Sequence, residues 1–156
     1  MSGGLSERSF EDHICDWLAA DGGYREPKVG TATPSLDVAA GLDVDDVFGF
    51  LLDTQPDEWA ELCVRHGSEP TARKGFLRRL VSELAKRGTV DVLRHGVEDL
   101  GINMRMAFPQ PAHELTPEVV ARYEANRLTV IRQLPYKEDS EETIDLGLFV
   151  NGIPTA

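Results

Sequence analysis

The pair Asn151-Gly152 constrains the fold of this chain more than any other feature. It lies between two runs rich in apolar residues, 143–150 and 153–156. An Asn-Gly pair in that setting is the strongest short-range signal for a β-hairpin, because both turn residues need a positive φ. We therefore predict a strand over 143–150, a two-residue turn, and the start of a second strand. In such a hairpin Val150 pairs with Ile153, so the numbers of paired residues sum to 303.

Asp145 interrupts the first arm of this hairpin, which is otherwise mostly apolar. A carboxylate within an apolar strand is costly unless it is paired, hydrogen-bonded or bound to a metal. A functional role for Asp145 is one interpretation, and an edge strand whose Thr143–Asp145 face meets water is the other. The residue opposite Asp145 would be position 158, beyond Ala156. A second arm of four residues is short, so we expect the hairpin, and with it the chemistry, to continue past this sequence.

The first helix is expected directly after the N-terminal residues. Ser9 and Asp12 have the spacing of a capping box, and Gly22-Gly23 is a typical helix end. The helical repeat predicts one apolar, inward face. Its members are Phe10, Ile14, Trp17 and Leu18.

The rest of the first half also has mainly helical signals. Two prolines and two glycines predict an irregular loop over 24–41. Asp43 is the predicted N-cap of a helix over 44–54, and Pro56 and Pro70 open two further helices that end at Gly67 and Gly88. A short helical segment over 89–95 follows.

The second half changes to a period of two. Strands are predicted over 102–108 and 128–136, a helix over 117–127 between them, and then the final hairpin. The predicted fold class is therefore α/β (α+β), with a helical layer packed on a mixed β-sheet. We expect a single domain over 1–156, mainly helical over 6–96 and with the sheet core beginning in 97–156.

The net charge of −11 and the pI of about 4.7 disfavour direct binding to nucleic acid or to an anionic membrane unless basic residues cluster. They do cluster in one predicted helix. Its basic side chains could follow a phosphate backbone, or they could form a solvated face opposite the apolar stripe. The cluster consists of Arg73, Lys74, Arg78, Arg79, Lys86 and Arg87.

Cysteine usage and hydropathy point to a reduced, cytoplasmic environment without a membrane. Cys15 and Cys63 are far apart in sequence, no apolar run approaches a membrane span, and the first residues contain no apolar signal segment. With His13 and His66 the cysteines spell H-x-C and C-x-x-H, which raises the possibility of zinc. Positions two apart on a helix point in nearly opposite directions, so buried cysteines and exposed histidines are the favoured interpretation.

Five segments, taken in this order, make the chain resemble a known family. They are FEDHICDWLAADGGY, FLLDTQPDEWAEL, LVSELAKRGTVDVLRHGVEDLG, YEANRLTVIRQLPY and IDLGLFVNGIPTA. Together they resemble the N-terminal nuclease region of the R (HsdR) subunit of type I restriction enzymes, over nearly the whole chain. The combination is specific, although no single segment is.

The resemblance implies a nuclease of the PD-(D/E)xK type with an incomplete restriction-endonuclease-like core. The first metal-binding Asp of the family falls on Asp145, and a Glu on the first helix that often joins such sites is best matched by Glu11. The E-x-K pair of the family would follow on the second arm of the hairpin, and a Q-x-x-x-Y motif on a later helix. The ATP-hydrolysing motor of the family comes later still.

Mg²⁺ would be the cofactor of such a site, because it prefers hard oxygen ligands such as an Asp and a Glu on adjacent strands. One carboxylate alone holds the ion weakly, so we expect little metal binding and no significant DNA cleavage by these residues alone. The implied partners are DNA, reached through the whole complex, and the modification (M) and specificity (S) subunits of a system that defends a bacterial cell.

Two other classes of function stay open. The chain could be a non-catalytic interaction module of a restriction complex. It could also be an acidic DNA mimic that inhibits DNA-binding proteins, which the net charge permits. Acidic side chains spaced like phosphates along one face would favour the mimic, and a surface of mixed charge would count against it.

Overall fold

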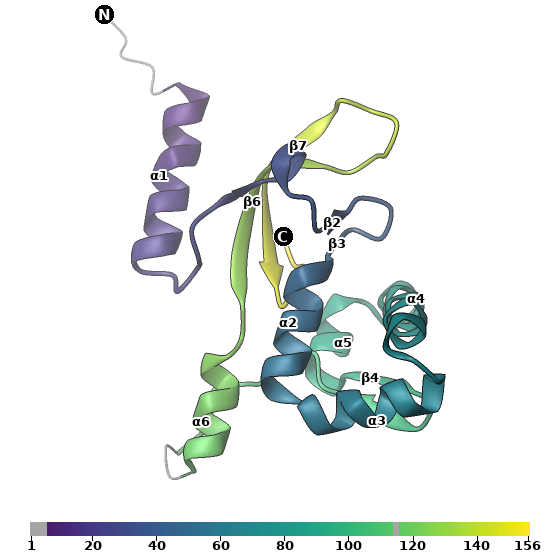
Figure 1. The fold of residues 1–156 in the computed structure, drawn as a ribbon. Helices are drawn as coiled ribbons and strands as arrows, with labels where there is room; N and C mark the ends of the chain where they lie inside the picture. The colour runs from purple at the N-terminus through teal and green to yellow at the C-terminus, as the bar shows by residue number, and fades with distance from the viewer. Residues whose placement is uncertain (1–5, 114–115) are drawn as a thin grey trace, which may run out of the picture. The chain divides into compact units, whose positions relative to one another are not determined.

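The computed structural model describes residues 6–113 and 116–156, and its fold class is mixed α/β, as predicted. The chain forms two compact units, shown in Figure 1. Unit 1 comprises residues 1–45 and 127–156, and unit 2 comprises residues 46–126. The prediction of a single domain is not tested by this division and stays a prediction. None of the helices in the described part of the chain is long and apolar enough to cross a membrane.

Unit 1 contains a four-stranded mixed sheet in the order β1-β6-β7-β8. β1 is parallel to β6, whereas β6, β7 and β8 are antiparallel neighbours. The predicted strands over 128–136 and 143–150 are confirmed, but β1 lies in a segment that was predicted to be a loop. The bounds are Lys28–Val29 for β1, Leu128–Pro135 for β6, Thr143–Val150 for β7 and Ile153–Pro154 for β8.

The turn between β7 and β8 is the predicted two-residue hairpin. Asn151 and Gly152 have φ values of 51° and 81°, and Val150 pairs with Ile153 as expected. The buried side chain of Asn151 accepts a hydrogen bond from the backbone nitrogen of Arg127 at 2.6 Å. The backbone nitrogen of Asn151 donates to the carbonyl of Arg127 at 2.8 Å. The turn is thereby attached to the residue before β6.

Helix α1, Glu7–Ala20, begins earlier than the predicted capping box implied. Ser6 is the N-cap, and its hydroxyl accepts a hydrogen bond from the backbone nitrogen of Ser9 at 3.3 Å. Ser9 therefore lies inside the helix, and its assignment as the cap was wrong. Gly23, with φ of 74°, follows the helix end as predicted.

The buried face of α1 also differs from the prediction. Cys15 and Leu18 pack against Val130 of β6, whereas Phe10 and Trp17 are 61% and 57% exposed. The helical repeat allows both faces, and the sheet selects between them, because its apolar residues receive the Cys15–Leu18 side. The partly buried residues packed against this cluster are Ile14, Tyr24, Leu146 and Leu148.

Residues 30–43 of unit 1 also form a short 3-10 helix and a small two-stranded sheet, separate from the four-stranded sheet. The 3-10 helix η1 spans Gly30–Ala32, and β2, Leu36–Asp37, is antiparallel to β3, Leu42–Asp43. Asp43 directly precedes helix α2, Val44–Thr54, which is the N-cap position predicted for it. Its carboxylate is fully buried and accepts hydrogen bonds from Lys28 Nζ at 2.7 Å and Ser35 Oγ at 2.8 Å. These partners satisfy the carboxylate within unit 1.

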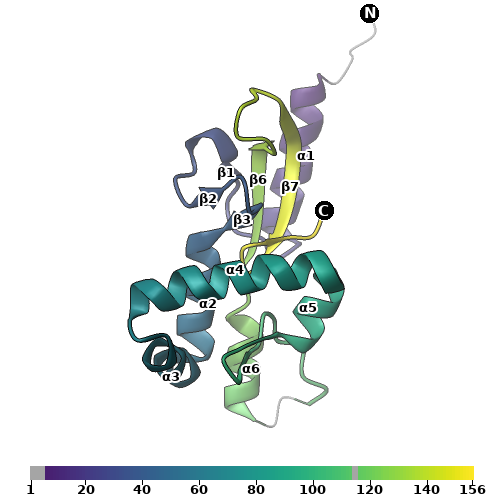
Figure 2. The ribbon, with the colours of Figure 1, turned by 90° about the vertical axis from the view of Figure 1, so that its right-hand side faces the viewer.

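Unit 2 is mainly helical, with one small β-hairpin (Figure 2). Phe48, Trp59 and Phe76 form an aromatic cluster in its core, with ring centroids 5.3–6.5 Å apart. The predicted prolines in the first turns and the glycines after the ends of α3 and α4 are confirmed. The elements are α2 (Val44–Thr54, from Asp46 on), α3 (Pro56–His66), α4 (Glu69–Arg87), α5 (Thr89–His95), β4 (Val97–Asp99), β5 (Ile102–Met104) and α6 (Pro117–Glu124).

Candidate functional site

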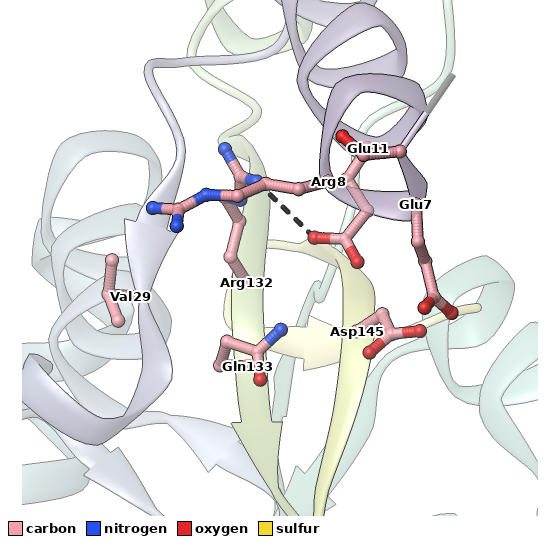
Figure 3. Close-up of a pocket in the computed structure, with 8 residues that line it drawn as sticks. Glu7, Arg8, Glu11, Val29, Arg132, Gln133 and Asp145 are labelled. Atoms are coloured by element: carbon pink, nitrogen blue, oxygen red, sulfur yellow. Dashed lines mark hydrogen bonds and ion pairs between the residues drawn. The ribbon is translucent and has the colours of Figure 1, made fainter. Parts of the chain in front are cut away.

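A cavity of about 690 Å³ in unit 1 brings together the two residues that the sequence analysis singled out. Glu11 comes from α1 and Asp145 from β7, near opposite ends of the chain (Figure 3). The cavity is open to solvent, so a ligand can reach both carboxylates. Its other lining residues are Ser6, Glu7, Arg8, Val29, Arg132 and Gln133.

The strand pair that carries Asp145 is distorted at that position. Arg132 pairs with Leu146 and Leu134 with Ile144, so Gln133 stands opposite Asp145 between two regular pairs. Gln133 has φ of 50°, a left-handed conformation that is uncommon for a residue other than glycine. Such conformations cost free energy and cluster at functional sites. The distortion therefore marks the position of Asp145 as unusual in an otherwise regular sheet.

Glu11 is held by an arginine from the sheet. Its side chain is only 12% exposed, and its Oε2 atom lies 3.3 Å from Nη2 of Arg132, as the dashed line in Figure 3 shows. Nη1 of the same guanidinium donates to Asp12 Oδ1 at 2.6 Å. The hydrogen bonds with Asp12 and then Glu11 raise the pKa of Arg132 above its ordinary value, although burial opposes this. Arg132 is thus a permanent cation at the wall of the cavity.

Charges of opposite sign occupy different sides of this cavity. Figure 3 shows the carboxylates of Glu7, Glu11 and Asp145 toward one side and the guanidinium groups of Arg8 and Arg132 toward the other. Over residues 6–113 and 116–156, no three His, Cys, Asp or Glu side chains are close enough to form a metal-binding group. Mg²⁺ usually keeps several waters and takes only one or two protein carboxylates. A site of that kind in this cavity would use the carboxylates of Asp145 and Glu11.

The four residues that raised the question of zinc are divided between the units. His13 and Cys15 belong to α1, and Cys63 and His66 belong to α3. Cys15 is 3% exposed within the apolar cluster, and burial raises the pKa of its thiol. Burial also raises the pKa of the Cys63 thiol, and neither cysteine forms a disulfide. Both cysteines are free thiols, Cys15 buried and Cys63 partly buried.

Sequence reasoning missed several residues of the cavity. Arg132 carried a usable signal, because a charged side chain in the apolar run 128–135 is as unusual as Asp145 in its own strand. Gln133 carried no such signal, since nothing in its residue type predicts a positive φ. Glu7 and Arg8 were missed because the helix was expected to begin later than it does.

In comparisons with protein-family models, curated proteins and solved structures, nothing matches this chain. The functional proposal therefore depends on the resemblance in sequence and on the residues of the cavity.

Proposed function

We propose that this chain is the N-terminal part of the endonuclease and motor subunit of a type I restriction-modification system. The proposed reaction of the full subunit is metal-dependent cleavage of DNA phosphodiester bonds. The observation that carries the proposal is the shared cavity of Glu11 and Asp145. The resemblance places the first metal-binding Asp of the family on Asp145, and a Glu on the first helix, best matched by Glu11, often joins such sites.

Within the proposed site, Asp145 is the main metal ligand and Glu11 the second. Bound Mg²⁺ would polarise the phosphoryl oxygen and activate the attacking water. Arg132 acts as a positioning residue, since its guanidinium holds Glu11 at 3.3 Å while remaining bonded to Asp12. The E-x-K pair that such nucleases add does not follow Asp145 in these residues. We therefore propose that the chain by itself does not cut DNA at a significant rate.

The proposed partners follow from the same assignment. A chain with net charge −11 gains little from general attraction to DNA. Delivery to DNA by the ATP-driven motor region and by the M and S subunits would remove the need for such attraction. The proposed location is the cytoplasm.

The charge pattern bears on the two alternative functions. Several acidic side chains are paired with arginines, for example Glu11 with Arg132 and Glu83 with Arg87. This mixed charge counts against an acidic DNA mimic. An interaction module is the other alternative, and capture of M and S subunits by the chain, together with an extended version that does not nick DNA, would favour it.

The sharpest test of the nuclease proposal is nicking of supercoiled plasmid with Mg²⁺ or Mn²⁺. The proteins compared are this chain and a version extended through the next strand and helix of the coding sequence, each with and without Asp145→Ala. Asp139→Ala is the matched control, because Asp139 is an exposed carboxylate in the loop between β6 and β7.

We expect only the extended version to nick, with a loss of about a hundredfold or more for Asp145→Ala and none for Asp139→Ala. An extended version that is inactive with both metals would refute the nuclease. Nicking by the short chain that depends on Asp145 would refute the claim that this chain alone is inactive. A simpler check is the coding sequence just after Ala156, where an in-frame E-x-K is expected.

A further inference from the structure

Helix α4 of unit 2 carries a second cavity, of about 340 Å³, that the nuclease proposal does not use. Its polar and charged lining residues recur at helical spacing, so they share one side of α4. Residues from α3 and from the start of α4 complete the wall. The lining residues are His66, Pro70, Thr71, Lys74, Gly75 and Arg78.

Only some of the cations of α4 are already engaged by acidic neighbours. Arg73 pairs with Glu69 at 3.2 Å, and its guanidinium lies over the ring of Phe48. Arg79 and Arg87 both pair with Glu83. Within the described ranges 6–113 and 116–156, by contrast, the exposed cations Lys74 and Arg78 have no ion-pair partner. Lys86, farther along α4, also has no ion-pair partner among these residues, but it does not line the cavity. The unpaired cations that line the cavity are Lys74 and Arg78.

Thr71 adds a neutral donor beside these cations. Its Oγ1 atom accepts a hydrogen bond from Ser68 Oγ at 2.9 Å. Because Thr71 accepts in this bond, its own hydroxyl proton is available to an acceptor other than Ser68. An acceptor in the cavity could therefore receive bonds from Thr71, Lys74 and Arg78, which are three donors on one side of one helix.

The lack of a side chain at Gly75 leaves space for the imidazole of His66 in the cavity wall. A Cβ atom at this position would lie 2.5 Å from Cε1 of His66, so any larger residue would displace the imidazole. The ring is fixed from its other side, where Nε2 of His66 lies 2.8 Å from Oδ2 of Asp99. Both side chains of this pair are largely buried. The imidazole of His66 therefore has a fixed position in the cavity wall.

We propose that this cavity binds a phosphate group. Two cations and a hydroxyl donor suit a phosphate, which has several oxygens to accept charge-assisted hydrogen bonds. Among the described residues that line the cavity there is no carboxylate, and two carboxylates beside those residues are already engaged, Glu69 by Arg73 and Asp99 by His66. The ligand is either a phosphodiester of a nucleic acid backbone or free phosphate, which share this chemistry. The site lies in unit 2 and needs no metal, so it goes beyond the proposed nuclease.

The test uses the full chain in EDTA, with a short labelled DNA duplex and with inorganic phosphate as separate probes. Lys74→Gln/Arg78→Gln removes the two cations that line the cavity. The matched control is Lys86→Gln/Arg94→Gln, which changes the net charge equally at exposed positions outside the cavity. Binding of the duplex is followed by fluorescence anisotropy at several salt concentrations. Binding of phosphate is followed through amide NMR shifts.

We expect phosphate to shift the amides of Thr71, Lys74, Gly75 and Arg78 in the unchanged chain and in the control. We expect Lys74→Gln/Arg78→Gln to lose these shifts. If the source is nucleic acid, duplex binding falls about tenfold in that variant and the slope of log K against log salt falls by about 1 to 2. If the source is free phosphate, the shifts persist in the presence of duplex. Both results support the site.

The proposal is overturned if neither probe binds, or if the Lys74→Gln/Arg78→Gln variant binds both probes as the unchanged chain does. An equal loss in Lys86→Gln/Arg94→Gln also overturns it, because net charge would then explain the binding. Asp145→Ala separates this proposal from the nuclease, since it should leave both probes unaffected.

Discussion

Arg132 of β6 lies 3.3 Å from Glu11 of α1, and this contact joins the first helix of unit 1 to its sheet beside Asp145. The two side chains are 22% and 12% exposed, so the pair is screened less than a surface ion pair. Asp12 binds the same guanidinium. One arginine therefore serves both the packing of α1 and the position of a proposed ligand.

Replacing Arg132 should loosen α1. Arg132→Ala leaves the largely buried Glu11 without its cation, and we expect a loss of about 1 to 3 kcal/mol in the free energy of unfolding. Arg8→Ala is the control, because Arg8 lines the same cavity but has no ion pair in the described part of the chain. Urea unfolding and hydrogen exchange of the α1 amides measure the effect. Equal stability of Arg132→Ala and Arg8→Ala would contradict it.

Metal binding should depend on both carboxylates of the cavity. Because two protein ligands hold Mn²⁺ or Mg²⁺ only weakly, we expect weak binding in the unchanged chain and a further loss of about tenfold in Asp145→Asn. Glu11→Gln should cause a smaller loss, since Arg132 already neutralises part of its charge. Calorimetry with Mn²⁺ measures both, and Asp139→Asn should behave like the unchanged chain. If Asp145→Asn binds Mn²⁺ as tightly as the unchanged chain, Asp145 is not a metal ligand.

The two thiols should differ in reactivity. Burial raises the pKa of both, but Cys15 is 3% exposed within the cluster under α1 whereas Cys63 is partly accessible on α3. A thiol reagent near neutral pH should therefore label Cys63 first and Cys15 only as unit 1 opens. Cys15→Ser and Cys63→Ser assign the two phases. Faster labelling of Cys15 would show that α1 does not cover it as described.

Acid should weaken the junction of α4 and α5. Hydrogen bonds from Arg87 lower the pKa of Glu83 below its ordinary 4.5 and that of Asp91 below 3.8. A lowered folded-state pKa stabilises the fold above the unfolded-state pKa, and this stabilisation is lost as the pH falls through the folded-state pKa. Arg87→Gln should thus be less stable than the unchanged chain near neutral pH, with the difference shrinking below about pH 4. Urea unfolding midpoints of both proteins across this pH range measure the difference in stability. A difference that does not change with pH would show that ionisation of Glu83 and Asp91 is not its cause.

The hairpin turn should resist substitution at Asn151. Asn151→Ala loses the side-chain hydrogen bond to the Arg127 backbone and places alanine at φ of 51°, so we expect a loss of about 2 kcal/mol or more. Asn151→Gly loses the same bond but tolerates the conformation, so its loss should be smaller. Thermal unfolding of both variants separates the two effects. Equal losses would mean that backbone strain contributes nothing.

Several local features of the fold followed from the sequence alone. The Asn151-Gly152 turn and its register were predicted because a positive φ at two successive residues is a local requirement that few residue types meet. Pro56 and Gly67 bounded α3 for similar reasons, since each acts through its own backbone. Asp145 was found because a charge in an apolar strand is costly wherever the strand lies. These signals need no knowledge of the partner elements.

The tertiary structure decided what the local signals left open. It turned Cys15 and Leu18 of α1 inward and left Phe10 and Trp17 in solvent, although both faces have helical spacing. It also placed β1 beside β6 and Gln133 in a left-handed conformation. Each outcome depends on residues far apart in the chain, whose contacts have no counterpart in local periodicity.

The candidate site shows the same division. Residue type and family resemblance identified Asp145 and Glu11 one at a time. Their presence in one cavity, and the cation of Arg132 beside Glu11, arise from the packing of α1 on the sheet. A partly buried Glu11 is tolerated because that packing delivers a guanidinium to it. The sequence alone thus determined which groups could act, and the tertiary structure decided which of them meet, because burial and pairing energies depend on neighbours that only folding brings together.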